Sequence, residues 1–252
     1  MEVRRYIPIS LPQNKVMKIK AVVFDLDGTL LPMDQSLFMK AYFGGLAKKL
    51  APRGYDPEKL VKAIMLGSQA MVQNDGKKTN EEVFWDKFSE IFGEDVRKDE
   101  PYFEEYYYED FDKVSDSCGY NPEAAVAVAK IKDMGLRVAL GTNPLFPSIA
   151  TEKRTRWAGL DVSDFEFYTT YENSYFCKPN LHYYEDILKK LNLACEEVLM
   201  VGNDVDEDLV AEQLGMKVFL LTDSVLNRQN KDVSAYPSGS FAELLEFIKT
   251  LI

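Results

Sequence analysis

The stretch that decides the fold is KIKAVVFDLDGTLL, residues 18–31. Its apolar run VVF, residues 22–24, contains only β-branched and aromatic side chains, which predicts a central parallel strand covered on both faces. Asp25 and Asp27 follow this run, and Gly28 then permits a sharp turn. Ligands bind at the carboxyl ends of the strands in open α/β sheets. The two aspartates are therefore expected at the ligand-binding edge of such a sheet.

The pair formed by Asp25 and Asp27 also indicates a metal. Two carboxylates this close would repel each other in a partly desolvated cleft unless a cation joined them. Ligation by oxygen atoms alone points to Mg²⁺. The alternative for this segment by itself is an ordinary turn in which Thr29 acts as a cap.

A second apolar run, RVALGTN at residues 137–143, ends in a hydroxyl and an amide. The hydroxyl of Thr142 and nearby backbone N–H groups can hold a phosphoryl oxygen, and Pro144 stops the strand. Taken alone, the segment is also compatible with a strand followed by a simple Thr-Asn-Pro turn. It is thus a candidate anion-binding site at a second strand end.

A further run, EVLMVGNDVDED at residues 197–208, breaks at Gly202 into an acidic cluster. Clustered carboxylates without a cation are electrostatically unfavourable, so a metal is the simplest explanation. The alternative is an acidic helix N-terminus favoured by the helix dipole. Both interpretations place the acids directly after a strand.

Together these segments resemble a known family. DLDGTL, residues 25–30, resembles the first motif of the haloacid dehalogenase-like hydrolases, a superfamily dominated by Mg²⁺-dependent aspartyl-phosphate phosphatases. Residues 137–143 and 197–208 resemble its second and fourth motifs, and Lys178 resembles the third. The four motifs occur in the order that the superfamily requires. The resemblance covers residues 18–225, which is most of the chain.

The resemblance implies phosphoryl transfer through a covalent intermediate. Asp25 would attack phosphorus, and Asp27 would protonate the leaving oxygen and later activate water. Mg²⁺ and Lys178 would stabilise the charge on the transferring group. Thr142 and the N–H of Asn143 would orient the phosphate oxygens.

The resemblance also implies a metal site made by Asp25, by Asp27 through its backbone carbonyl, and by Asp204 and Asp208. The fourth motif departs from its commonest form, because Asn203 stands where relatives often carry an aspartate. Two registers follow, with either Asn203 or Asp204 facing the metal. We favour Asp204, because a hard cation prefers an ionised carboxylate to an amide oxygen.

About 110 residues separate the first two motifs, far more than one crossover helix needs. Asp56 before Pro57, and Thr79 with Glu82, are typical helix starts within this insert. The resemblance implies that the insert is a helical cap over the active site. The expected division is an N-terminal extension at 1–16, an α/β core at 17–33 and 115–252, and a helical cap domain at 34–114. The expected core of the cap is Phe38, Tyr42, Leu46, Leu60, Ile64, Trp85 and Phe88.

Helix and strand patterns alternate after residue 121, which is the signature of a doubly wound parallel sheet in an α/β, Rossmann-like fold. The expected strands are 165–170 and 217–221, and the expected helices are 122–135, 147–158, 180–191, 206–214 and a last helix capped by Ser240 and Glu243.

Composition narrows the class of protein. The 252 residues carry a net charge of −11 and no basic stripe, which argues against nucleic acid as a partner. No apolar stretch reaches the ~18–20 residues needed to cross a bilayer, so no membrane partner is expected. Cys118, Cys177 and Cys195 show no disulfide or zinc pattern, which fits free thiols in a reducing cytoplasm. The expected protein is a cytoplasmic monomer or homodimer.

The leading interpretation is a Mg²⁺-dependent phosphatase acting on a small phosphorylated metabolite. One alternative is a phosphomutase on the same scaffold, which returns the phosphoryl group to the sugar instead of to water. Another is a non-catalytic binding or regulatory protein that keeps the fold. Dehalogenation is disfavoured, because dehalogenating relatives lack the second aspartate and Asp27 is present here.

Overall fold

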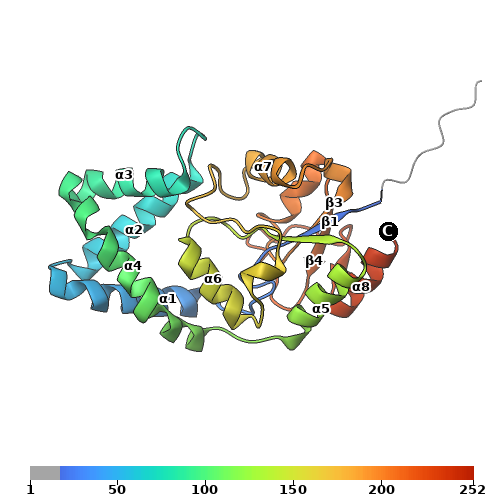
Figure 1. The fold of residues 1–252 in the computed structure, drawn as a ribbon, viewed down its shortest axis with the longest axis horizontal. Helices are drawn as coiled ribbons and strands as arrows, with labels where there is room; N and C mark the ends of the chain where they lie inside the picture. Colours follow the sequence, from blue (N-terminus) through green and yellow to red (C-terminus); the bar gives the residue numbers. More distant parts are fainter. Residues whose placement is uncertain (1–17) are drawn as a thin grey trace, which may run out of the picture.

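The computed structural model describes residues 18–252, so the extension expected at 1–16 lies outside the described residues. Its centre is one five-stranded sheet with the strand order β2-β1-β3-β4-β5 (Figure 1). Every neighbouring pair is parallel, which confirms the expected doubly wound α/β fold. The strands are β1 (Ala21–Phe24), β2 (Arg137–Leu140), β3 (Val198–Gly202), β4 (Lys217–Leu221) and β5 (Ser238–Gly239).

Helices surround the sheet and fill the insert between β1 and β2. The α-helices are α1 (Gln35–Leu50), α2 (Pro57–Val72), α3 (Asn80–Phe92), α4 (Glu100–Glu109), α5 (Pro122–Asp133), α6 (Ser148–Trp157), α7 (Leu181–Leu191) and α8 (Phe241–Lys249). The 3₁₀-helices are η1 (Ala51–Arg53), η2 (Glu94–Asp99), η3 (Phe111–Ser117), η4 (Val162–Asp164), η5 (Cys195–Glu197) and η6 (Leu209–Leu214). Within the described residues, no helix combines the length and apolar character that crossing a bilayer requires.

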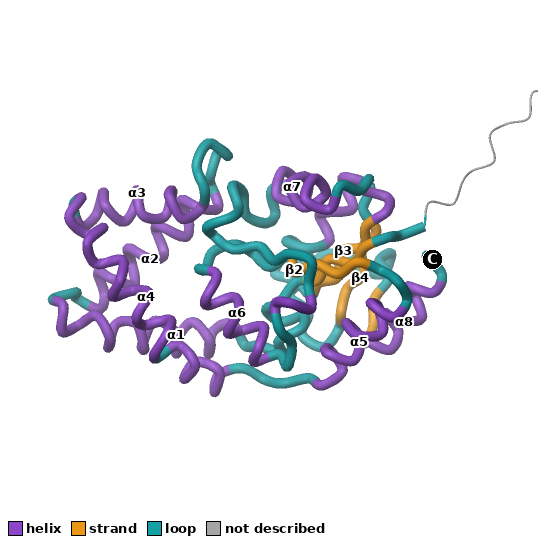
Figure 2. Tube along the Cα trace, in the orientation of Figure 1, coloured by secondary structure: helices purple, strands orange, loops and turns teal. Residues whose placement is uncertain are grey.

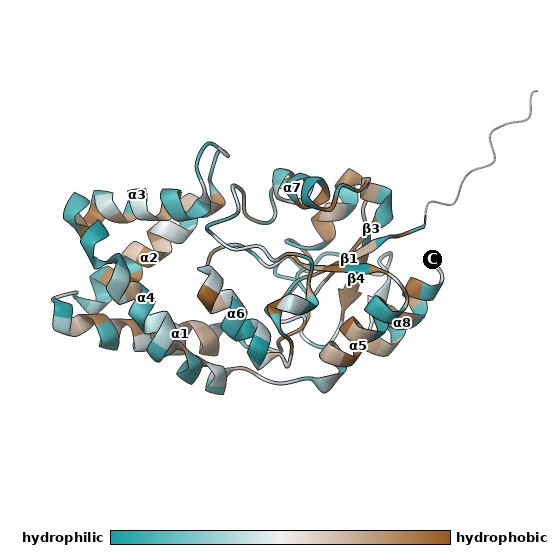
Figure 3. Cartoon of the chain, in the orientation of Figure 1, coloured by the Kyte–Doolittle hydropathy of each residue, from teal (hydrophilic) through white to brown (hydrophobic). Residues whose placement is uncertain are grey.

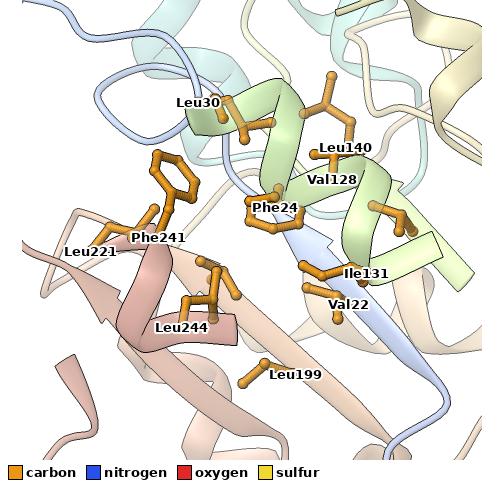
Figure 4. Packing of buried hydrophobic residues seen from close by; sticks show 14 of the residues in the cluster. Val22, Phe24, Leu30, Val128, Ile131, Leu140, Leu199, Leu221, Phe241 and Leu244 are labelled. Carbon is orange, nitrogen blue, oxygen red and sulfur yellow. The ribbon is translucent and has the colours of Figure 1, made fainter. Parts of the chain in front are cut away.

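Alternation along the strands divides the core into two layers. Val22 and Phe24 pack with α5 and α8 on one face of the sheet, as Figure 4 shows. Ala21 and Val23 point to the other face, where they pack with α7 and η6. In Figure 3 the strands and the inner sides of α5 and α8 are hydrophobic. Because β1 is buried on both faces, its carboxyl end is held rigidly at the centre of the sheet edge.

Helices α1 to α4 form a separate group at one end of the molecule, and α6 lies between this group and the sheet (Figure 2). The group has its own hydrophobic cluster, rich in aromatic side chains. Local signals start its helices as expected: Asp56 caps α2 ahead of Pro57, and Thr79 with Glu82 forms a capping box on α3. All seven core residues expected here are buried, namely Phe38, Tyr42, Leu46, Leu60, Ile64, Trp85 and Phe88.

Two expected elements differ from the structure. Residues 165–170 form no strand, although Glu166 and Thr169 donate backbone hydrogen bonds to β2 and Tyr168 makes a single parallel bridge with Leu140. The ladder stops because the N–H of Thr170 bonds the side chain of Asn173, which turns the chain away. The helix expected at 206–214 is only the short 3₁₀-helix η6, which ends at a left-handed glycine.

Candidate active site

Three strand ends meet at one edge of the sheet. Asp25 follows β1 directly, Asn203 follows β3, and Thr142 comes two residues after β2. Because β1 lies between β2 and β3, these side chains gather at the point where the strand order reverses, the usual ligand site of such sheets. A cavity of about 260 Å³ opens there, lined among others by Asp25, Asp27, Thr142, Asn143, Asp204 and Asp208.

Lys178 joins the first and fourth motifs. Its Nζ lies 2.8 Å from Asp25 Oδ1 and 2.7 Å from Asp208 Oδ1, and its side chain is 1% exposed. Burial alone would favour the neutral amine, but the Asp208 and Asp25 carboxylates outweigh it and raise the pKa of Lys178 well above its usual value. Burial also raises the pKa of Asp208, against the effect of the ammonium. A buried cation is thus fixed beside the carboxylate at the end of β1.

The hydroxyl group of Thr29 lies between the second carboxylate oxygen of Asp25 and the side chain of Asn203. Thr29 Oγ1 lies 2.9 Å from Asp25 Oδ2 and 3.0 Å from Asn203 Oδ1. The Asn203 amide is oriented by its Nδ2, which donates to the carbonyl oxygen of Ser224 over 2.7 Å. Gly28, at φ 91°, leaves space for this amide, because a Cβ there would lie 2.3 Å from Asn203 Nδ2.

Asp27 forms an ion pair with Arg154, a wholly buried residue on α6. The Arg154 guanidinium also donates to Thr151, one turn earlier on the same helix. The second oxygen of Asp27, Oδ1, is buried without a hydrogen-bond partner. Burial raises the pKa of Asp27, Arg154 opposes this shift and Asp25 adds to it. The pKa of this carboxyl is therefore shifted in the direction that favours its protonated form.

Asp204 has partners at both carboxylate oxygens. Its Oδ1 accepts hydrogen bonds from the backbone N–H groups of Asp206 and Glu207, at 2.9 and 3.1 Å. Its Oδ2 pairs with Arg228 over 2.5 Å. The carboxylate at this position thus shapes the turn after β3 and holds an arginine from the loop that follows β4.

The loop after β2 brings Thr142 and Asn143 to the cavity. The carbonyl oxygen of Thr142 accepts hydrogen bonds from Thr169 Oγ1 at 2.7 Å and from the Tyr183 hydroxyl at 2.9 Å, which fixes the loop. Asn143 Nδ2 donates to Glu207 Oε2 over 3.0 Å. Burial raises the pKa of Glu207 to about 7. Asn143 Oδ1 is buried without a partner.

The residues expected to hold a metal, Asp25, Asp27, Asp204 and Asp208, all line this cavity, as does Asn203 of the alternative register. Among residues 18–252, no group of three or more His, Cys, Asp or Glu side chains is positioned to hold a metal together. Asp27 and Asp204 pair with separate arginines, and Asp208 pairs with Lys178. The oxygen atoms on the Asp25 side of the cavity come from a carboxylate and from the Asn203 amide. Carboxylate and amide oxygens are the ligand types that Mg²⁺ accepts.

Four residues of this site were not anticipated from the sequence. Thr29 belongs to the DGT stretch itself, so its signal was present. Glu207 lies inside the acidic cluster. Arg154 and Arg228 carry no local signal, because only the fold brings α6 and the loop after β4 to the ends of β1 and β3.

Comparisons with known proteins show the family to which the chain belongs. A model of the haloacid dehalogenase-like hydrolase family matches residues 19–215. A glyceraldehyde 3-phosphate phosphatase from Methanocaldococcus jannaschii is 29% identical over 132 residues, which are 52% of this chain and 57% of that protein. The match therefore spans little more than half the length of this curated relative.

Solved structures share the fold at low identity. A HAD phosphatase from Thermococcus onnurineus superposes with a TM-score of 0.56 at 19% identity, covering 91% of this chain and 98% of that one. A 2-haloacid dehalogenase from Pseudomonas syringae pv. Tomato DC3000 gives a TM-score of 0.60 at 20% identity, covering 93% and 100%. At these identities the likeness concerns the fold.

Proposed function

Because the chain belongs to the haloacid dehalogenase-like hydrolases, we propose that it hydrolyses a small phosphorylated metabolite through an aspartyl phosphate on Asp25. The observation that carries this proposal is the buried ammonium of Lys178 between Asp25 and Asp208. An ammonium fixed beside a carboxylate at a ligand-binding strand end can neutralise both the nucleophile and an incoming phosphate. The relative from M. jannaschii is named for such a small phosphate ester.

The roles of the residues follow from their contacts. Lys178 and Thr29 each hold one oxygen of Asp25, so the carboxylate is oriented before the substrate arrives. Asp27, whose pKa is raised by burial, donates the proton that the leaving oxygen needs and later accepts one from water. Thr142 and the N–H of Asn143, at the end of β2, orient the phosphate oxygens.

A Mg²⁺ ion would add charge neutralisation at the transferring phosphoryl group. We propose that Asp25, the backbone carbonyl of Asp27 and the Asn203 amide oxygen hold it. We favour this register over the one expected from charge, because the Thr29 hydroxyl places Asn203 Oδ1 beside Asp25, whereas Asp204 pairs with Arg228 and with two backbone N–H groups. Asp208 then acts mainly through Lys178.

We further propose that α1 to α4 act as a cap, with the boundaries 34–114 for the cap and 17–33 plus 115–252 for the core. Residues at the start of the insert, including Phe38 and Met39, line the cavity that contains Asp25. The side chain of Asn80, at the start of α3, reaches the carbonyl oxygens of Pro144 and Phe176. Such an arrangement limits the site to small substrates. The free thiols fit the cytoplasm as the place of action.

A generic aryl phosphate tests the metal-dependent phosphatase. We expect release of inorganic phosphate only when a divalent cation is supplied, because the carboxylates alone would repel the substrate. The same protein with excess chelator is the control, and restoring Mg²⁺ should restore turnover. Comparable turnover with chelator would contradict metal dependence, and no turnover under any condition with a panel of phosphorylated metabolites would contradict the phosphatase.

A further inference from the structure

A second cavity lies between helices α1 to α4 and the start of α6. Its volume is about 360 Å³, larger than the cavity at the strand ends. The two cavities share Met39, Leu145 and Phe146 as lining residues, so they adjoin. A phosphate ester whose phosphate lies at Asp25 can therefore extend its alcohol part past these three side chains into the second cavity.

The walls of the second cavity are aromatic. The lining rings include Tyr42, Phe84, Trp85, Phe103, Tyr107 and Tyr171. Several are held by ring contacts, with the centroids of Phe84 and Trp85 5.4 Å apart and those of Trp85 and Phe103 5.3 Å apart. The hydroxyls of Tyr42 and Tyr107 lie 2.8 Å from each other. Aromatic faces bind apolar groups, and their negative quadrupole attracts cations.

Four glutamates line the same cavity, and none of its lining residues is a lysine or an arginine. Glu172 Oε1 accepts the N–H of Ser148 at 2.8 Å, and Glu172 Oε2 is buried without a partner. Among the described residues, neither Glu81 nor Glu172 forms a salt bridge, while Glu100 pairs with Arg97. Burial raises the pKa of Glu81, the nearby Glu172 carboxylate adds to this shift, and Arg97 opposes it.

These contacts leave Glu172 Oε2 buried without a partner, and the partly exposed Glu81 carboxylate without a salt bridge, beside aromatic faces. We propose that the second cavity binds the alcohol part of the substrate, and that this part has an apolar carbon skeleton that bears an ammonium group. The proposal rests on the phosphatase function, since it concerns the group that the phosphate leaves. The cation would meet Glu172 Oε2 and Glu81, and its carbon skeleton would pack on rings such as Trp85 and Tyr107. An anionic alcohol part would be repelled.

Three aryl phosphates with similar shape and different charge test this proposal. The esters are 4-(aminomethyl)phenyl, 4-ethylphenyl and 4-(carboxymethyl)phenyl phosphate. We expect kcat/KM to fall in that order. The Glu172→Gln variant should lower the ratio of kcat/KM for the cationic ester to kcat/KM for the neutral ester by about tenfold. One charge-assisted contact contributes roughly that factor. Comparing this ratio between variants removes differences in leaving-group chemistry.

Glu58→Gln is the matched control, because Glu58 is an exposed carboxylate on α2 that does not line the cavity. Its ratio should equal that of the wild type. Glu81→Gln is a second variant that should lower the ratio in the same direction as Glu172→Gln. A wild type that prefers the neutral or the anionic ester would overturn the proposal, as would a ratio unchanged in both cavity variants.

A binding measurement separates this proposal from the phosphatase itself. The chain has two tryptophans, Trp85 in the cavity and Trp157 outside it, so Trp157→Phe makes fluorescence report on Trp85. We expect 4-methylbenzylammonium, which has no phosphate, to change this fluorescence saturably, and much less so after Glu172→Gln. If no ester is hydrolysed but this binding occurs, the cation site stands and the phosphatase fails. If esters are hydrolysed without such binding, the cation site fails alone.

Discussion

At the scale of single residues, the site is organised around charges that are buried together. Asp25 and Asp208 share the ammonium of Lys178, and Asp27 and Asp204 each have an arginine of their own. Removing water from charged groups is costly unless each has a partner. The pairing places a cation beside each of these four carboxylates in a chain of net charge −11.

Replacing Lys178 should show how strongly this arrangement depends on it. We expect Lys178→Met to lower the free energy of unfolding by about 3 kcal/mol near pH 8, because it leaves buried carboxylates unpaired. The pKa of Asp208 is raised in the folded protein, so acid protonates this group there before it does in the unfolded chain. The difference in unfolding free energy between the wild type and Lys178→Met should therefore shrink as the pH falls through that raised pKa. Urea unfolding in chelator at several pH values measures it.

The control for that measurement is Lys132→Met. Lys132 pairs with Asp164 at the surface over 3.2 Å, and exposed pairs contribute about 0–1 kcal/mol. Its loss should be small at every pH. An equally small and pH-independent loss in Lys178→Met would contradict the view that Lys178 neutralises buried carboxylates.

Single residues also determine the register of the fourth motif, in which either Asn203 or Asp204 faces the metal. We expect Asn203→Ala to raise the Mg²⁺ concentration needed for half-maximal activity many-fold, because it removes the amide oxygen that faces Asp25 through Thr29. Asp204→Ala should change this concentration less and mainly lower stability, because it removes the partner of Arg228. Titration of activity with Mg²⁺ measures both. The opposite order would restore the register in which Asp204 faces the metal.

At the scale of elements, the side chain of Asn80 is one link between α3 and the sheet domain, beside the backbone hydrogen bonds of Asn80 to Ser174 and of Glu81 to Tyr171. This residue is fully buried, and its Nδ2 lies 3.3 Å from the Pro144 carbonyl oxygen and 3.3 Å from Cys177 Sγ. Its Oδ1 accepts from Asn74 Nδ2 at 2.9 Å. One side chain thus connects the loop before α3 with the loops after β2 and before Lys178.

Truncating this link should weaken the attachment of the helices. We expect Asn80→Ala to cost about 1–3 kcal/mol of unfolding free energy, because several buried polar groups lose their partner. Gln69→Ala on α2 is the control, since Gln69 is an exposed amide and its loss should be close to neutral. Equilibrium denaturation compares the two variants. Equal midpoints would show that Asn80 carries no such role.

Elements whose ends carry a local signal could be predicted from the sequence. The capping boxes of Thr79 with Glu82 and of Ser240 with Glu243 start α3 and α8 as expected. The segment 165–170 could not be assigned correctly, because its β-type residues are the same in a strand and in an extended segment. The difference lies in the Asn173 side chain, which captures the N–H of Thr170.

At the scale of the whole molecule, the candidate site follows from topology. The four motifs could be found in sequence because each directly follows a strand or precedes a helix, and the parallel order of the sheet brings them together. Arg154 and Arg228 could not be found in this way. Their partners are 127 and 24 residues away, and no local pattern encodes such contacts.

The same topology separates the molecule into the sheet with its two packed faces and the helices α1 to α4 with their own aromatic cluster. The adjoining cavities lie where these parts meet. The strand ends would thus carry the chemistry. The helices α1 to α4 would select the alcohol part of the substrate.

The central claim, that Asp25 accepts the phosphoryl group, is tested most directly by trapping the intermediate. Protein turning over an aryl phosphate with Mg²⁺ is quenched with borohydride, which reduces an acyl phosphate to an alcohol, and the peptides are analysed by mass spectrometry. We expect homoserine at position 25, only when both substrate and Mg²⁺ are present, and none in Asp25→Asn. Trapping at another carboxylate, or sustained turnover by Asp25→Asn, would contradict the account.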